Sequence, residues 1–234
     1  CRAAYMKSPT EIIVGADMGN ILRSTNGGSV WNLLTTGSYL YGMDFLDANT
    51  GICVGYRGIV LKTTNSGLGW NDIKTIHGFE AYDVDVVSSN NVFVGSASGR
   101  FYSSVDGGLN FTERNLPNVS SGSTKTLWFF NANEGFAGGE MGSIYYTTNA
   151  GVLWTSVYSF GASFNNVEDI FFVNDSVGFA CGERGRFVKT VNRGQTWDST
   201  GIDGPNENTL WEMSFLNANT GYVGSTNGCI YKTS

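Results

Sequence analysis

The chain has 234 residues, of which 32 are glycine and only 15% are charged, and this length and composition suit one all-β barrel or propeller with many tight turns. Its formal net charge of −6 argues against nucleic acid and anionic membranes as partners, because both require a basic surface. No apolar run reaches membrane-spanning length and no charged-then-apolar leader opens the sequence, so we expect no membrane insertion and no signal peptide within it.

A motif of eight residues, here called the octet, recurs five times along the chain. Each copy consists of a hydroxyl residue, a free position, Asn or Asp, a free position, Gly, two free positions, and finally Trp or Phe. The copies occupy residues 24–31, 63–70, 104–111, 147–154 and 190–197. Successive closing aromatics are therefore 39, 41, 43 and 43 residues apart. A period of about forty residues, with one supersecondary unit per period, predicts a solenoid or a propeller.

The chemistry of the octet predicts a turn that carries its own hydrophobic anchor. Asn or Asp accepts a hydrogen bond from the backbone two residues on and tolerates left-handed backbone, and the leading hydroxyl acts similarly. The Gly at the fifth position supplies a positive φ without a Cβ clash. The closing Trp or Phe buries roughly 150–250 Å². We therefore expect the octets to have a structural role.

Each period contains three apolar stretches, the octet, and a fourth apolar stretch. In the second period the four stretches are Gly42–Leu46, Gly51–Tyr56, Ile59–Thr63 and Trp70–Ile76. Polar turns such as residues 47–51 join the first stretch to the second, and tight glycine turns such as residues 57–58 join the second to the third. Nothing in the sequence indicates a helix, so the stretches are expected to be strands.

The predicted fold class is all-β, a β-propeller with six blades of four antiparallel strands, the last blade incomplete. We expect a single propeller domain over residues 1–234, with blade units at 1–38, 39–79, 80–123, 124–165, 166–208 and 209–234. The sixth unit stops where its octet would begin, so its fourth strand either lies outside this chain or is not needed to close the ring. A β-solenoid favours shorter periods, and a sandwich would not repeat so regularly.

The four cysteines are too few and too scattered for a disulfide scaffold or a zinc site. Cys53 and Cys181 lie inside apolar stretches, which predicts buried thiols. Cys1 and Cys229 fall in the first and last repeats, which leaves a ring-closing disulfide open as an alternative to free thiols.

With five octets in phase over nearly the whole chain, the sequence resembles the Asp-box, or BNR-repeat, propellers. Residues 182–197 are similar to photosystem II stability/assembly factor-like proteins, which are usually described with seven blades rather than six. The wider group includes sialidases and xyloglucan-degrading enzymes. The resemblance implies that the octets lie on the face opposite the functional one. The working face then holds the links between blades and the turns between second and third strands.

The expected working face carries a mixed charged rim with aromatics between the charges. Its candidate binding residues are Arg57, Arg100, Arg184, Glu183, Tyr41, Tyr82, Asp169, Trp211 and Glu212. The same links and turns also offer Tyr39, His77, Phe79, Glu80, Glu140, Phe160, Phe164, Asn227 and the polar run 115–126. Exposed aromatics beside polar groups suit recognition of a peptide or a sugar. The alternative is that the charges are solvated and the aromatics cap the blade edges.

Signals for catalysis are weak. His77 is the sole histidine, and the sequence contains no elbow-type nucleophile motif, no phosphate-binding glycine loop and no cluster at metal-ligand spacing. Glycoside hydrolysis needs only two carboxylates. The candidates at the mouth of a propeller channel are Asp83, Glu168, Asp169 and Glu212. The sequence departs from the sialidases because residues 115–117, Asn-Leu-Pro, lack the Arg of their early Arg-Ile-Pro element, and from the xyloglucanases because those use two larger propellers.

We therefore expect a non-catalytic interaction or assembly module that binds a protein partner on the inter-blade loop face, without a cofactor or metal. The alternative is a carbohydrate-binding protein or a glycoside hydrolase, sialidase-like or xyloglucanase-like, that holds a glycan in the same channel. A third hypothesis is one domain of a larger secreted or surface protein. Richness in Asn, Ser, Thr and Gly with few lysines fits an extracytoplasmic location, which is periplasmic, secreted or at the cell surface.

Overall fold

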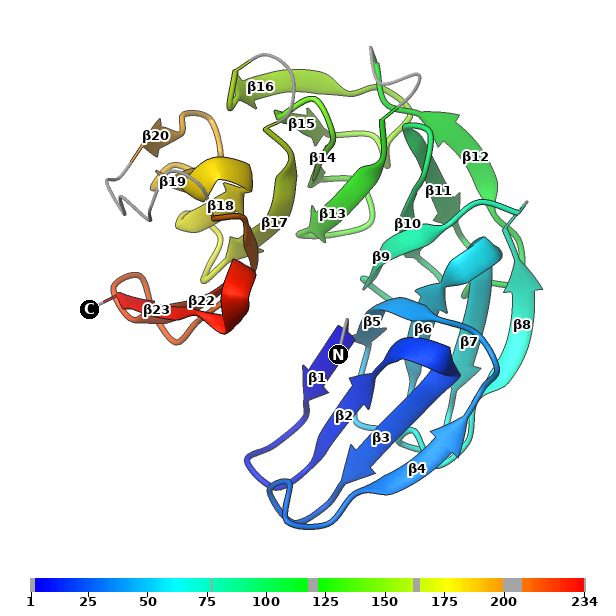
Figure 1. Ribbon diagram of the computed structural model, residues 1–234. Coiled ribbons are helices and arrows are strands. Elements are labelled where there is room, and N and C mark those ends of the chain that lie inside the picture. The colour runs from blue at the N-terminus through cyan, green and yellow to red at the C-terminus, as the bar shows by residue number, and fades with distance from the viewer. Residues whose placement is uncertain (1–2, 77, 118–121, 162–164, 200–207, 234) are drawn as a thin grey trace. The chain divides into compact units, whose positions relative to one another are not determined.

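The protein is all-β, with six antiparallel sheets that follow one another along the chain (Figure 1). The structure is a computed structural model and describes residues 3–76, 78–117, 122–161, 165–199 and 208–233. Two compact units divide the chain, Cys1–Arg114 and Asn115–Ser234, and each is described by itself. The sheets are the blades of a β-propeller, which confirms the fold class predicted from the repeats.

The first unit holds three four-stranded blades, each a meander in chain order. Blade 1 consists of β1 (Ala3–Met6), β2 (Ile12–Gly15), β3 (Asn20–Ser24) and β4 (Asn32–Thr35). Blade 2 consists of β5 (Leu40–Phe45), β6 (Gly51–Gly55), β7 (Ile59–Thr63) and β8 (Asn71–Thr75). Blade 3 consists of β9 (Ala81–Val86), β10 (Val92–Ser96), β11 (Arg100–Ser104) and β12 (Thr112–Asn115), the last strand ending one residue past the unit boundary.

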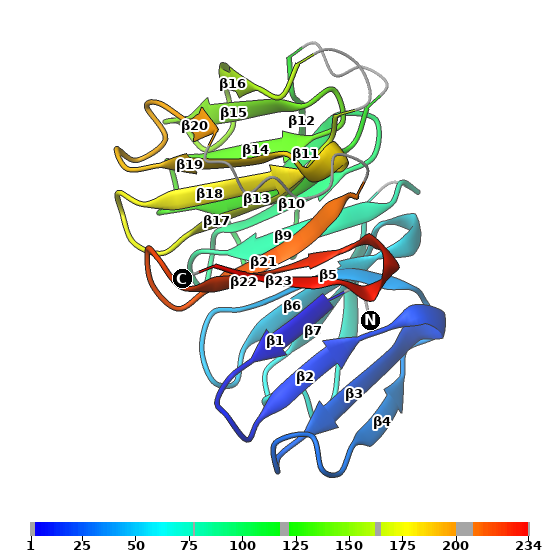
Figure 2. The same ribbon diagram turned by 60° about the vertical axis from the view of Figure 1, so that its left-hand side comes forward.

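The second unit holds two four-stranded blades and one blade of three strands. Figure 2 shows the strands β17 to β20 of one blade side by side in chain order. Blade 4 consists of β13 (Thr124–Phe129), β14 (Gly135–Gly139), β15 (Ser143–Thr147) and β16 (Thr155–Ser159). Blade 5 consists of β17 (Val167–Phe172), β18 (Gly178–Gly182), β19 (Phe187–Thr190) and β20 (Asp198–Ser199). Blade 6 consists of β21 (Leu210–Phe215), β22 (Gly221–Ser225) and β23 (Ile230–Thr233), so the last blade is incomplete, as expected.

Helical structure in the described residues is limited to four single turns of 3-10 helix. They are η1 (Asp17–Gly19), η2 (Tyr56–Gly58), η3 (Glu183–Gly185) and η4 (Thr226–Gly228). All four are tight turns between second and third strands, where a left-handed residue precedes a left-handed glycine, as at Arg57 (φ 57°) and Gly58 (φ 71°). No helix in the described ranges is long and apolar enough to cross a membrane.

The hydrophobic core lies between consecutive blades of each unit. In the first unit one cluster joins blades 1 and 2 through Ile13, Leu40 and Phe45, and another joins blades 2 and 3 through Val54 and other aliphatic side chains. Clusters in the second unit join blades 4 and 5, and blades 5 and 6, in the same way. In the middle blade of each unit, β6 and β18 are buried along their whole length, because a blade of the same unit lies against each face.

The five octets form one repeated hydrogen-bond network. In each, the leading hydroxyl donates to the Asn or Asp side chain and accepts the backbone N–H two and four residues on, as Thr147 does with Asn149 and Gly151. The carboxamide or carboxylate oxygen then accepts the N–H four residues on, at 2.8–3.0 Å in all five copies. The octets are therefore turns, but the Asn or Asp bond spans four residues rather than the expected two.

Both central positions of each octet turn have left-handed backbone. The expected Gly at the fifth position has φ between 75° and 91°. The fourth position is also left-handed, with φ between 58° and 74°, although Ser66, Ala150 and Arg193 carry side chains there. The N–H of the fourth position donates to a carbonyl in the turn between the first and second strands, at 2.9–3.0 Å in every copy. This bond fixes the octet to its own blade and offsets the unfavourable backbone.

Three closing aromatics of the octets, Trp70, Trp154 and Trp197, pack edge-on against phenylalanine rings. Trp70 contacts the edge of Phe45, and Trp197 stands edge-on over Phe136 and Phe172. Trp154 and Trp197 are buried, whereas Trp31 is 39% exposed. The expected burial is therefore wrong for Trp31.

The buried thiols predicted at Cys53 and Cys181 are confirmed, since both are free and fully buried, and burial raises the pKa of each. Cys229 is exposed, and its suggested partner Cys1 lies outside the described residues.

Replacing Thr147 by Val tests the octet network, because Val keeps the shape of Thr and removes the buried hydroxyl. The change leaves the N–H of Gly151 without its acceptor, so the free energy of unfolding is expected to fall by about 1–3 kcal/mol in urea titrations. The matched control is Thr148→Val, at an exposed position in the same octet. Equal losses in the two variants would contradict the assigned role of the hydroxyl.

Candidate functional site

The turns between second and third strands are fastened to the start of the first strand of the same blade. Tyr56 N–H donates to Tyr39 O at 2.8 Å, and Glu183 N–H donates to Asn166 O at 3.1 Å. The equivalent bond recurs in blades 3, 4 and 6. These turns therefore lie at the end of each blade where the link from the previous blade arrives. We call this the link end; the octets lie at the opposite end of the strands.

A β-bulge at the start of the first strand recurs in five blades. The pairing of first and second strands skips one residue there, as between Leu40 opposite Gly55 and Gly42 opposite Val54. The skipped residues, here called the bulge residues, are Tyr41, Tyr82, Lys125, Glu168 and Trp211. A bulge re-aims a side chain and is common beside functional sites. Tyr41, Tyr82 and Trp211 are candidate binding residues from the sequence, and Glu168 is one of the candidate carboxylates. Lys125 was not predicted.

In the first unit the link end is rich in tyrosine and arginine. The bulge residues Tyr41 and Tyr82 are stacked, with ring centroids 5.8 Å apart. Tyr39 and Tyr56 meet edge to face at 6.0 Å, and the Arg57 guanidinium lies 5.3 Å from the centre of the Tyr56 ring. Tyr39, Tyr56 and Arg57 are exposed. Together these residues form an aromatic surface with a cation at its edge.

Arg100 differs from Arg57 in being engaged by its own blade. Its Nε donates to Glu113 Oε1 at 2.9 Å, and its guanidinium lies 3.8 Å from the centre of the Phe79 ring. Glu113 also accepts the hydroxyl of Tyr102. Arg100 thus helps to hold the link between blades 2 and 3, and its charge is partly neutralised by Glu113.

In the second unit the link end carries charges of both signs. Lys125 Nζ lies 3.4 Å from Glu168 Oε2, so adjacent bulge residues pair as they do at Tyr41 and Tyr82. Glu183 accepts the Asn166 side chain at 3.0 Å, which holds turn η3 against the link. Arg184 and Glu212 are exposed, and Trp211 is 50% exposed.

Asp169 has a structural partner. Its Oδ2 accepts the N–H of Met213 on the next blade at 2.8 Å. Thr126 accepts the N–H of Ile170 in the same way, and Asp44 accepts the N–H of Val86 at 2.7 Å. These side chains join the first strands of consecutive blades within one unit.

Burial shifts the acidity of these inter-blade carboxyls. The pKa of Asp169 is raised to about 7, mainly by desolvation; the Met213 N–H acts against the shift, and the nearby charge of Glu212 adds to it. Desolvation likewise raises the pKa of Asp44 to about 6. Glu168 also has a raised pKa because of burial, although Lys125 acts in the opposite direction. Carboxyls that stay partly protonated near neutral pH are able to donate as well as accept protons.

The candidate residues thus fall into two groups, one in each unit. Arg57, Arg100, Tyr41 and Tyr82 lie at the link end of blades 2 and 3. Glu183, Arg184, Asp169, Trp211 and Glu212 lie at the link end of blades 5 and 6. Tyr56 was missed, although it directly precedes the Arg57-Gly58 turn that marks this end. His77, Phe164 and residues 118–121 of the polar run lie outside the described residues.

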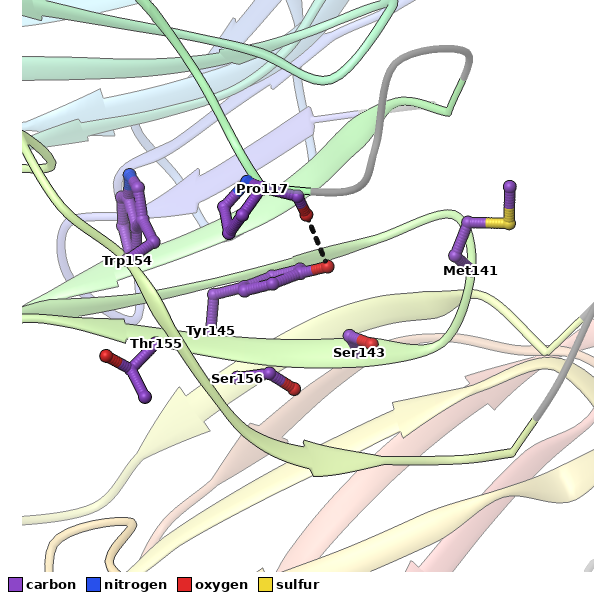
Figure 3. Close-up of a pocket in the computed structure, with 7 residues that line it drawn as sticks. All are labelled: Pro117, Met141, Ser143, Tyr145, Trp154, Thr155 and Ser156. Carbon is purple, nitrogen blue, oxygen red and sulfur yellow. Dashed lines mark hydrogen bonds between the residues drawn. The ribbon is translucent and has the colours of Figure 1, made fainter.

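A separate pocket of about 500 Å³ lies on blade 4 (Figure 3). Tyr145 forms its floor and donates its hydroxyl to Pro117 O at 2.9 Å. The remaining lining residues are Met141, Ser143, Trp154, Thr155 and Ser156. The lining offers rings and hydroxyls but no carboxylate, histidine or cation, so it suits binding rather than acid–base chemistry. Among the described residues, no group of three or more His, Cys, Asp or Glu side chains is placed to hold a metal ion.

Comparison with known proteins supports the propeller fold. No protein-family model matches the chain, and no curated protein matches its sequence. The chain is similar in structure to YCF48 bound to D1 peptide, with a TM-score of 0.56, 14% identity, and coverage of 99% of this chain and 92% of that one. YCF48 from Cyanidioschyzon merolae gives the same score and identity, with coverage of 99% and 94%.

A second group of similar structures consists of enzymes. The GH74 xyloglucanase from Xanthomonas campestris has a TM-score of 0.71 and 12% identity, and the match covers 95% of this chain but 42% of the enzyme. At such identities the likeness shows the propeller fold alone. It confirms the architecture that the sequence resemblance implied.

The raised pKa values predict how stability depends on pH. A carboxyl whose pKa is higher in the folded than in the unfolded state binds more protons when the protein is folded. Its contribution to the free energy of unfolding is therefore complete below about pH 4 and is lost as the pH rises through the pKa of the folded state. The free energy of unfolding is therefore expected to increase as the pH falls from 7.5 to 5, by at most about 1.4 kcal/mol per pH unit for each carboxyl.

The Asp169→Asn variant is expected to flatten this dependence between pH 7.5 and 5, since Asn still accepts the Met213 N–H but does not titrate. Urea titrations at a series of pH values measure it. An unchanged pH profile in the variant would show that Asp169 does not titrate in this range.

Proposed function

We propose that the protein is a non-catalytic module that binds a peptide segment of a protein partner at its link end. The observation that carries the proposal is the aromatic surface of the first unit, where Tyr41 stacks on Tyr82 and Tyr39 meets Tyr56 beside Arg57. Tyr and Arg dominate the residues that contribute most to protein–protein binding, because they bury large areas and keep a polar end.

The rigidity of this surface supports the proposal further. The bulge residues belong to first strands, and the Tyr56 turn is bonded to the Tyr39 link at 2.8 Å. A peptide would therefore meet side chains that are already held in place, which lowers the entropy lost on binding. The structural likeness to a propeller described as bound to a D1 peptide gives independent support, since it provides a peptide-binding precedent for this fold.

Glycan hydrolysis is the second candidate function. The observation that favours it is Asp169, whose pKa of about 7 suits a general acid and which has the carboxyl of Glu212 nearby. The likeness to a GH74 xyloglucanase supports the same candidate. Against it, Asp169 already accepts a backbone N–H from the next blade, a role that Asn would fill equally well.

Binding to an array of defined twelve-residue peptides tests the leading proposal. Selected peptides are expected to lose at least about tenfold in affinity for a Tyr41→Ala/Tyr82→Ala variant, because two stacked rings are removed from the contact surface. Arg57→Ala should weaken binding without unfolding the blades, since Arg57 is an exposed turn residue beside the Tyr56 ring.

The control is Leu68→Ala with Leu109→Ala, which removes exposed apolar side chains from two octets at the opposite end. Thermal melts establish that every variant is folded. Binding that survives the link-end changes and disappears in the octet variant would refute the proposal.

For the second candidate, hydrolysis of a polysaccharide panel by the wild-type chain is expected to fall at least about 100-fold in Asp169→Asn, because proton transfer to the leaving oxygen is lost. Glu113→Gln, a carboxylate of blade 3 paired with Arg100, serves as the control. No release of reducing sugar by the wild-type chain would rule out hydrolysis on that panel.

A further inference from the structure

Two exposed tyrosines meet at the link end of blade 2 and form a corner of two aromatic rings. Tyr39 is the last residue of the link before β5, and Tyr56 opens the turn η2. Their ring centroids are 6.0 Å apart, and the ring planes make an angle of 76°. Tyr39 is 40% exposed and Tyr56 is 37% exposed, so a ligand is able to reach both side chains. We call this pair the tyrosine corner.

The backbone holds the tyrosine corner in place. Tyr56 N–H donates to Tyr39 O at 2.8 Å, which ties the turn to the link. A Cβ added at Gly55 would lie only 1.9 Å from Tyr39 O, so this close approach requires glycine. The two rings are therefore positioned before a ligand arrives, which lowers the entropy lost on binding.

The tyrosine corner offers hydrogen-bond donors, whereas its backbone acceptors are already engaged. Tyr56 O accepts both the N–H of Ile59 and the hydroxyl of Ser38. Tyr39 O accepts the N–H of Tyr56. The guanidinium of Arg57, 5.3 Å from the centre of the Tyr56 ring, only donates, and the two phenol hydroxyls are able to donate as well. A ligand with carbonyl oxygens and no N–H groups is therefore complementary in charge to this surface.

Proline is the residue that meets these requirements. It has no backbone N–H, so its burial against the tyrosine corner leaves no donor without an acceptor. Its compact apolar ring is able to lie on the face of one tyrosine and against the edge of the other. In a polyproline II segment the carbonyl oxygens make no internal hydrogen bonds and are open to donors on a partner. Aromatic-lined surfaces bind such segments in other domains.

We propose that the tyrosine corner binds a proline residue of a peptide partner that is in the polyproline II conformation. The inference rests on the proposed function and names the chemistry of the peptide. The pyrrolidine ring lies between Tyr39 and Tyr56, and carbonyl oxygens beside it accept hydrogen bonds from Arg57 and the phenol hydroxyls. Because the polyproline II helix is already formed in the free peptide, little ordering is needed on binding.

Fluorescence anisotropy titrations with short peptides test the inference without knowledge of the natural partner. The probe is fluorescein-Gly-Pro-Pro-Pro-Pro-Pro-Gly-amide, and the comparison peptide has alanine in place of every proline. The proline peptide is expected to bind the wild-type chain saturably, and the alanine peptide is expected to bind at least about fivefold more weakly, because it lacks the rings and carries N–H groups. Equal affinity for the two peptides overturns the inference.

Single variants locate the binding. Tyr39→Ala and Tyr56→Ala are each expected to weaken binding of the proline peptide at least about fivefold, whereas Tyr56→Phe, which keeps the ring, is expected to lose less. The matched control is Tyr222→Ala, which removes a tyrosine that is 44% exposed on β22 and should leave affinity unchanged. Thermal melts establish that each variant is folded.

Two results with these variants contradict the inference. One is an equal loss of affinity in Tyr222→Ala and Tyr56→Ala. The other is binding of labelled cellotetraose in place of the proline peptide, lost in Tyr56→Ala, which would assign the tyrosine corner to a glycan.

This test separates the inference from the proposed function. Array-selected peptides without proline that lose affinity in the Tyr41→Ala/Tyr82→Ala variant, together with no binding of the proline peptide, would refute the inference and leave peptide binding intact. Binding of the proline peptide that is lost in Tyr39→Ala and in Tyr56→Ala supports the inference whatever the array selects.

Discussion

The burial of both faces of the middle sheet in each unit is the constraint on which the rest of the structure depends. Strands such as β6 and β18 are buried at every residue, because a blade lies against each face within its unit. A buried carboxyl such as Asp44 or Asp169 accepts a backbone N–H of the next blade. One end of the strands is occupied by the octets, whose polar atoms bond to their own backbone. The link end is the end at which we propose that a peptide binds.

The bulge residues connect this constraint to the proposed recognition of a peptide. Each bulge displaces one side chain from the regular alternation at the start of a first strand. The displaced side chains then pair with those of the neighbouring blade, tyrosine on tyrosine in the first unit and lysine with glutamate in the second. The residue after a bulge residue, such as Asp169, instead joins the blades, because its side chain accepts a backbone N–H of the next blade.

Much of the fold could be predicted from the sequence, because the octets and the glycine turns are local signals that recur at a constant period. The bulges could not, because a bulge is a property of the pairing between two strands and leaves no local mark around Lys125 or Glu168. The role of Asp169 was hidden for a similar reason, since its partner Met213 is 44 residues away. Trp31 shares the local pattern of Trp154 and Trp197, yet it is exposed where they are buried, so the octet alone does not predict how far its aromatic is covered.

The central claim is that the link end, and not the octet end, meets the partner. Hydrogen–deuterium exchange with and without a bound array-selected peptide tests it most directly, because it locates protection along the whole chain. The account predicts slower exchange in the turns between second and third strands and at the starts of first strands, around residues 38–42, 55–58 and 80–83. Protection confined to the octets, or to the outer strands β8 and β16, would contradict it.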